Sequence, residues 1–157
     1  MHITYNEELA KHELMQGDVI KRTPEINALL KEVHPHFFNH PKNLYFMILT
    51  QSCDLVRRKA GGTCKAPYIS IAPVRAIDLA VERLMSQLEP VNIRAQLPVL
   101  GNKSKSKVTE FLQRLYNNNE PGYFYLDCAD TELPTDCVAF LNLSIAIKST
   151  LHMDKCI

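Results

Sequence analysis

Residues 44–50 read LYFMILT, and this stretch decides the fold class of the chain. All of its side chains except the last are apolar or aromatic, with no polar alternation. A short continuous apolar run of this kind is typical of a strand that is buried on both faces. We therefore predict a central, largely buried strand here, with Phe46 and Ile48 in the main core.

Four further segments have the composition of strands. Residues 19–22 (VIKR) and 123–126 (YFYL) are short, and residues 67–73 (PYISIAP) are bounded by prolines, which predicts a strand shorter than its neighbours. Residues 138–148 (VAFLNLSIAIK) alternate, which predicts one long strand. Because strands outnumber βαβ units, we predict an α+β protein with a small antiparallel β-barrel or curled sheet of about five strands.

Helices are expected at the front of the chain and between the third and fourth strands. The patterns predict helices over residues 6–15, from Thr23-Pro24 to His34, over 76–88 and over 108–116, with a loop at 35–40 and irregular chain at 90–107. The chain is expected to form a single domain, 1–157. Its parts would be a helical N-terminal part (1–40), a strand core (41–75 and 120–150) and a helical insertion (76–119).

Composition excludes several classes of protein. The chain has 157 residues, 46% of them apolar, so it can bury a core without a metal, a cofactor or a disulfide. Its net charge of +1 lacks the basic excess of a dedicated nucleic-acid binder. The N-terminus has no signal peptide, no apolar run could span a bilayer, and five cysteines is an odd number. These features predict a cytoplasmic protein with reduced thiols and no membrane contact.

The sequence Gln51-Ser52-Cys53-Asp54 follows the central apolar run, where a buried strand gives way to a loop. There Cys53 is a candidate nucleophile, Asp54 would orient a base, and His36, flanked by His34 and His40, is the candidate base. The alternative, which we favour, is that Cys53 is a small buried apolar residue and that Asp54 caps the turn. No spacing here matches a known cysteine-hydrolase signature.

The three histidines also have a spacing that could hold Zn²⁺, since catalytic zinc takes three protein ligands. However, their segment contains two prolines and two phenylalanines and resembles a loop held down by Phe37 and Phe38. Cys128 and Cys137 lack a CxxC partner. We therefore predict no metal site.

Basic residues gather in two places that could contact RNA or DNA. If both faced one side, they would form a phosphate-binding strip with Tyr123 or Tyr125 available for base stacking. Alternatively, they are solvated loops and the tyrosines belong to the core. Together with Gln51, the candidate binding residues are Arg57, Arg58, Lys59 and Lys65 in the first cluster and Lys103, Lys105 and Lys107 in the second.

A set of short motifs resembles a group of largely uncharacterised bacterial proteins. These motifs are Gly17-Asp18, then Gln51-Ser52-Cys53-Asp54, and later Tyr123-Phe124-Tyr125-Leu126, within a similarity that spans about residues 14–148. That group pairs a Gly-Asp start with a Gln-Ser-Cys-Asp turn and a late aromatic strand. Its members often carry a further helical tail, which implies that a chain ending at Ile157 is naturally short or cut.

More distantly, the order of Gly17-Asp18-Val19, an apolar strand and Ala72-Pro73-Val74 is similar to the SH3-like barrels of PemK/MazF-type toxins. Proteins of that type cleave single-stranded RNA or bind antitoxins. They tend to carry an arginine before the second strand, where this chain has Pro41-Lys42-Asn43. The resemblance therefore implies the SH3-like barrel more strongly than the ribonuclease activity.

These observations leave three functions open. We favour a non-catalytic accessory or protein-interaction domain of a bacterial phage-defence or stress (toxin–antitoxin-like) module, with a protein partner encoded nearby. The link to defence comes from the resemblance alone. The first alternative is a PemK/MazF-like endoribonuclease that acts on single-stranded RNA. The second is a cysteine-dependent hydrolase that uses Cys53.

Overall fold

A computed structural model describes residues 13–57, 64–88, 91–92, 98–99, 101–129 and 131–156. The chain divides into two compact units. The sheet unit comprises His2–Arg75 and Ala139–Ile157, and the hairpin unit comprises Ala76–Val138. Each is described by itself below, and a single domain stays a prediction.

The main sheet has six antiparallel strands and is not closed. Its order is β1-β2-β3-β7-β6, and β8 also pairs with β3. The α+β class and the antiparallel sheet are thus confirmed, whereas closure into a barrel is not. The strands are β1 (Val19–Lys21), β2 (Tyr45–Ile48), β3 (Tyr68–Ala76), β6 (Tyr123–Leu126), β7 (Cys137–Phe140) and β8 (Ile145–Lys148), and β4 (Val91–Asn92) and β5 (Pro98–Val99) form a separate two-stranded sheet.

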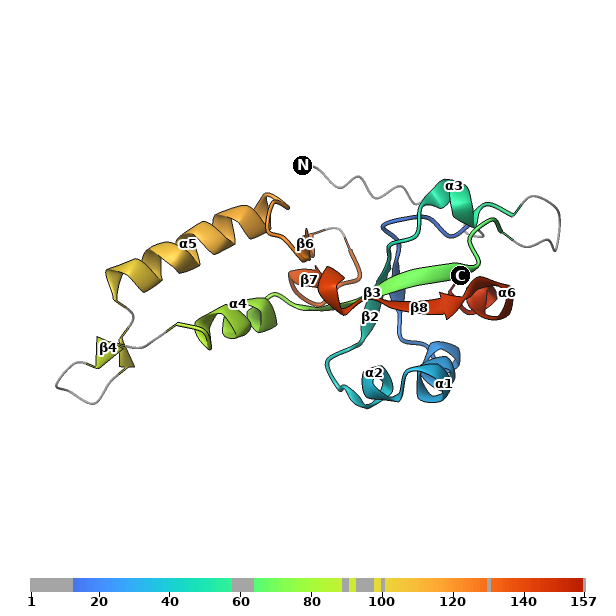
Figure 1. Cartoon of the computed structure of the whole chain (residues 1–157), viewed down its shortest axis with the longest axis horizontal. Coiled ribbons are helices and arrows are strands. Elements are labelled where there is room, and N and C mark those ends of the chain that lie inside the picture. Colours follow the sequence, from blue (N-terminus) through green and yellow to red (C-terminus); the bar gives the residue numbers. More distant parts are fainter. Residues whose placement is uncertain are drawn as a thin grey trace. The chain divides into compact units, whose positions relative to one another are not determined.

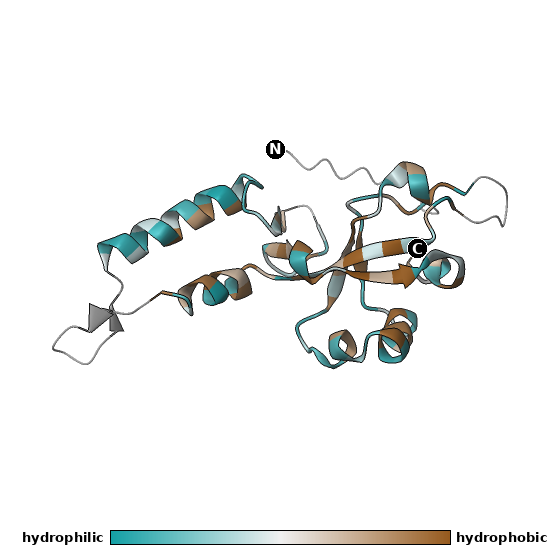
Figure 2. Ribbon diagram, in the orientation of Figure 1, coloured by the Kyte–Doolittle hydropathy of each residue, from teal (hydrophilic) through white to brown (hydrophobic). Residues whose placement is uncertain are grey.

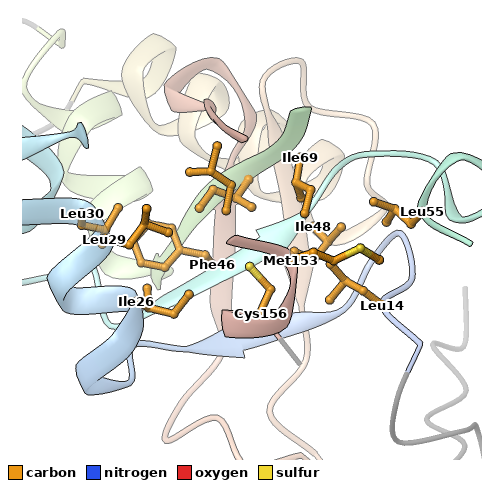
Figure 3. Packing of buried hydrophobic residues seen from close by; sticks show 12 residues of the cluster. Leu14, Ile26, Leu29, Leu30, Phe46, Ile48, Leu55, Ile69, Met153 and Cys156 are labelled. Carbon is orange, nitrogen blue, oxygen red and sulfur yellow. The ribbon is translucent and has the colours of Figure 1, made fainter. Parts of the chain in front are cut away.

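The predicted central strand is confirmed. Phe46 of β2 is opposite Ile20 of β1 on one side and Pro73 of β3 on the other, so β2 is an interior strand. Both Phe46 and Ile48 are 0% exposed. Figure 3 shows Ile26 and Leu29 gathered near Phe46, with Met153 and Leu14 beside Ile48. The continuous apolar pattern of residues 44–50 therefore correctly indicated a strand buried on both faces.

Helix α1 (Pro24–Val33) also forms as its sequence predicts. The Thr23 hydroxyl accepts a hydrogen bond of 3.3 Å from the backbone N–H of Ile26, and Pro24 takes the first helical position. Its buried side is made by Ile26, Leu29 and Leu30. The segment after it, expected to be a loop, is instead helix α2 (Pro35–Asn39). The proline that ends one helix is well placed to begin the next, because its missing N–H is not needed there.

Strand β3 corrects the expectation of a short strand at residues 67–73. It has nine residues, more than any other described strand, and pairs with β2, β7 and β8. Pro73 lies inside it, opposite Phe46. A proline favours a strand boundary because it cannot donate to a ladder, but one missing donor is tolerated in a strand with three partners.

The expected long strand at residues 138–148 is two strands. A 3-10 turn, η1 (Leu141–Leu143), separates β7 from β8. Each of them pairs with β3. Alternation alone could not reveal this break, because Leu141 and Leu143 fit the period of two whether or not the strand is continuous.

The remaining helices are α3 (Ser52–Leu55), α4 (Asp78–Met85), α5 (Asn102–Tyr116), α6 (Ser149–His152) and the 3-10 turn η2 (Met153–Lys155). Helix α5 begins six residues earlier than expected, so Lys103, Lys105 and Lys107 are helical rather than irregular. Figure 2 shows α5 as predominantly hydrophilic. Of the first expected helix, residues 6–12 lie outside the described part, and residues 13–15 are not helical. Among the described residues, no helix is both long and apolar enough to span a membrane.

Candidate functional site

The structure joins the Gly-Asp and Gln-Ser-Cys-Asp motifs, which lie more than thirty residues apart in the sequence. The backbone N–H of Gln16 donates to Ser52 Oγ (2.9 Å), and its side-chain amide donates to the Leu49 carbonyl (3.2 Å). The N–H of Gly17 donates to the Ile48 carbonyl (2.9 Å). We refer to residues 16–18 and 51–57 as the α3 corner.

Asp54 does not cap a turn, because residues 52–55 form helix α3. Its carboxylate accepts a hydrogen bond of 2.8 Å from Lys65 Nζ in a salt bridge. Its carbonyl accepts one of 2.9 Å from the N–H of Ala66. Leu55 is buried in the core on the other side of the helix. Asp54 therefore fixes the chain that enters β3 against α3.

Cys53 is exposed, so the expectation that it fills space in the core is wrong. Its sulfur lies 3.8 Å from Gln51 Oε1 and 3.9 Å from Asp54 Oδ1. The Gln51 amide oxygen is not a base, and the Asp54 carboxylate is already paired with Lys65. The thiol is thus presented on the surface beside a carboxylate that is paired with Lys65.

The structure does not bring Cys53 together with the candidate histidine base. His36 lies on α2, where its ring contacts Phe37 edge-on at 6.0 Å. Figure 1 shows α2 and α3 on opposite sides of the strands of the sheet unit. His34 Nε2 lies 3.1 Å from the Ala146 carbonyl, where it covers strand β8. These histidines therefore serve other contacts.

The two clusters of basic residues lie in different units of the chain. Arg57 forms a salt bridge with Asp154, and Lys65 forms the one with Asp54. Arg58 and Lys59 lie outside the described residues. The second cluster, Lys103, Lys105 and Lys107, lies exposed on α5 in the hairpin unit.

Tyr123 is packed within the hairpin unit. Its ring meets that of Phe111 edge-on, with centroids 5.9 Å apart. It is half-buried, so base stacking there would require this aromatic pair to be shared or broken.

A polar cluster that the sequence did not reveal lies at the ends of β6 and β7. The Asp136 carboxylate accepts hydrogen bonds from the Tyr125 hydroxyl (3.0 Å) and the Cys128 N–H (3.1 Å). The latter bond is the main cause that lowers the pKa of Asp136. Burial, with the hydrogen bond to Asp136, raises the pKa of Tyr125. The repeated Asp-Cys dipeptide, at 127–128 and 136–137, was the one signal in the sequence that could have pointed to it.

The same cluster contains the metal-type ligands that the described residues bring together. One ligand atom from each of Asp127, Cys128 and Asp136 lies within 4.8 Å of the others. However, the Asp136 carboxylate already accepts two hydrogen bonds. A hydrogen bond between the Cys128 side chain and Asp136 is also the main cause that raises the pKa of the Cys128 thiol. A protonated thiol is not a metal ligand. Among the described residues, His34, His36 and His40, whose spacing could hold Zn²⁺, do not form such a group.

Comparisons with protein-family models, with curated proteins and with solved structures gave no match. The α3 corner therefore has to be interpreted from its own geometry.

Proposed function

We propose that the chain is a non-catalytic protein-interaction domain of a bacterial stress or phage-defence module, and that the α3 corner contacts its partner. The observation that carries the proposal is the hydrogen bond from Gln16 to Ser52 beside an exposed Cys53. The motif uses its polar groups to fasten a turn to a helix, which is what a rigid binding surface requires.

The side chains that are exposed on the α3 corner suit a protein partner. Gln51 and Cys53 are exposed, and Val56 is 46% exposed although it is apolar. Apolar side chains without charged neighbours are typical of the core of an interface. The defence context and an SH3-like relationship are supported by the resemblance to PemK/MazF-type proteins, some of which bind antitoxins.

Co-expression of the tagged chain with the products of its neighbouring genes tests the proposal. We expect one neighbour to co-elute in a fixed ratio, and Val56→Lys to weaken that complex at least about tenfold. Val33→Lys is the matched control, because Val33 is 40% exposed and lies on α1. Equal loss with both variants, or no complex with any neighbour, would refute the assignment. Thermal unfolding of each variant checks whether the fold is kept.

The endoribonuclease and hydrolase alternatives have less support. Two of the basic side chains are committed to salt bridges, and Cys53 has no close base among its described contacts. Neither arrangement favours a reaction at the α3 corner.

A further inference from the structure

We refer to residues 36–43, which include most of α2 and the turn that follows it, as the cationic loop. Three of its backbone carbonyl oxygens accept hydrogen bonds from Arg22. Arg22 Nη2 donates to the Phe38 carbonyl (2.7 Å), and its Nη1 donates to the carbonyls of His40 (3.5 Å) and Asn43 (3.4 Å). The Arg22 guanidinium therefore donates hydrogen bonds to three backbone carbonyl groups of this loop. These three carbonyl oxygens are therefore paired with a cation of the chain itself, and the exposed side chains of the loop include His36 and Lys42.

A second arginine is fixed at the base of the loop. Asn43 is only 1% exposed, and its Oδ1 accepts a hydrogen bond of 2.8 Å from Arg75 Nε. The Asn43 amide donates to the Phe37 carbonyl (3.2 Å), while the Arg75 guanidinium lies over the Phe140 ring at 5.1 Å. These contacts hold a permanent positive charge beside the loop whether or not a ligand is present.

The pKa of His40 is lowered, and the causes of this shift indicate the sign of the charge around the ring. Burial is the main cause that lowers its pKa, followed by Coulombic interactions with Arg75, His36 and Lys42. No acidic group is among these causes. The N–H of Lys42 donates to His40 Nδ1 (3.3 Å), so in the neutral ring the proton is on Nε2, which is then a hydrogen-bond donor.

We infer that the cationic loop and Arg75 form a binding site for a phosphate group that carries a double negative charge. His36 and Lys42 are exposed, His40 is half-buried, and residues 36–43 contain no acidic side chain. Inorganic phosphate and a phosphate monoester carry about −1.5 to −2 charges at pH 7 and several strong acceptor oxygens. Lys42 and His40 supply donors to such an oxygen, while Arg75 supplies fixed charge.

The site predicts a coupling between ligand and proton. A bound anion favours the imidazolium form of His40, so saturation with phosphate should raise the pKa of His40. By linkage, a phosphate of fixed charge should bind more tightly to the chain with protonated His40 than to the chain with neutral His40, whereas loss of the second phosphate charge at falling pH acts in the opposite direction.

The test is a titration of the ¹H and ¹³C signals of the histidine rings in the whole chain with inorganic phosphate. Chloride at equal ionic strength is the control. We expect saturable shifts at His40 with a dissociation constant of roughly millimolar size, and a raised pKa at saturation. Uridine 5′-monophosphate identifies a nucleotide as the source if it binds more tightly than phosphate. Binding by octauridylate without a terminal phosphate, in the absence of binding by the other two, would overturn the assignment to a doubly charged group.

Two variants keep the test independent of folding. His40→Gln combined with Lys42→Gln should weaken phosphate binding at least about tenfold, followed through the signals of the remaining histidines. The control is Lys148→Gln, an exposed lysine on β8, which should change it less than about twofold. Equal affinity in the two variants, or equal shifts with chloride and phosphate, would refute the site.

Discussion

The backbone N–H of Gln16 and the hydroxyl of Ser52 are 2.9 Å apart and hydrogen-bonded. This bond ties the turn before β1 to helix α3, which follows β2. Strands β1 and β2 are antiparallel neighbours. The hydrogen bond from Gln16 to Ser52 therefore lies at the same end of this strand pair as the hydrogen bond from Gly17 to Ile48. The position of the exposed Cys53 thus depends on a hydroxyl next to it rather than on the thiol itself.

Replacing Ser52 with Ala should lower the free energy of unfolding by about 1 kcal/mol, because the Gln16 N–H loses its protein acceptor. Denaturation with urea measures this change. The control is Cys53→Ala, which removes an exposed side chain and should stay within about 0.5 kcal/mol of the parent. If both substitutions cost the same, the hydrogen bond does not hold the corner.

Truncating the core strand should be far more costly. Ile48→Ala should destabilise the protein by roughly 2–5 kcal/mol, since its side chain is fully buried and the cavity cannot collapse completely. Leu44→Ala removes the same number of carbon atoms at a position that is 53% exposed, and should cost much less. Chemical denaturation of the pair measures the difference. Similar losses would place the core elsewhere.

The sequence predicts elements whose signal is local. Residues 44–50 identified β2 because a short, continuous apolar run is typical of a buried strand, and Thr23-Pro24 identified the start of α1 from its cap. The sequence could not predict the length of β3 or the break at η1, because both follow from pairing with distant strands. Local patterns do not encode which strand lies beside which.

The candidate site shows the same limit. The sequence singled out Cys53 and Asp54, yet it could not show that Asp54 pairs with Lys65 or that Ser52 binds Gln16. The cluster around Asp136 was missed because its partners are brought together by the pairing of β6 with β7.

Asp136 should make stability depend on pH in the acid range. Its pKa is lowered in the folded chain, chiefly by the hydrogen bond from the Cys128 N–H. The resulting stabilisation is complete above the ordinary carboxyl pKa of 3.8 and is lost as the pH falls through the lower, folded value. Asp136→Asn should therefore lower stability at pH 7 by about 1–3 kcal/mol and flatten its dependence below pH 4.

Tyr125→Phe is the matched variant for this test. It removes one of the hydrogen bonds to the carboxylate and keeps the other, so it should cost about 1 kcal/mol and keep most of the pH dependence. Urea denaturation at several pH values between 2 and 7 compares the two variants. A parent protein whose stability does not fall below pH 4 would contradict the role given to Asp136.

All five thiols should be found free when the protein is unfolded without a reductant, since its five cysteines are unpaired in the structure. In the folded protein, Cys53 should react first with a thiol reagent because it is exposed. Cys137 should react slowly, because it is buried and burial raises its pKa to about 11. Finding only one or three free thiols in the unfolded chain would indicate a disulfide.

Two variants distinguish the functions proposed for the α3 corner. For an interaction domain, Cys53→Ser should keep partner binding and biological effect nearly intact, because the thiol has only long contacts with Gln51 and Asp54. For a hydrolase, the same change should abolish activity with an unchanged melting temperature, since serine forms no thiolate at neutral pH. For a ribonuclease, replacing Arg57, Arg58 and Lys59 together should abolish RNA binding and flatten its salt dependence, while Cys53→Ser is mild.

The basic triple variant needs its own control, because Arg57 pairs with Asp154 in the structure. Asp154→Asn removes the same ion pair and leaves the basic side chains in place, so it reveals any loss caused by the missing salt bridge alone. RNA binding at several salt concentrations, partner binding and thermal unfolding should be measured on all three variants. The interaction assignment is lost if Cys53→Ser folds normally and is inactive. It is also lost if the triple variant abolishes RNA binding and biological effect together while Asp154→Asn changes neither.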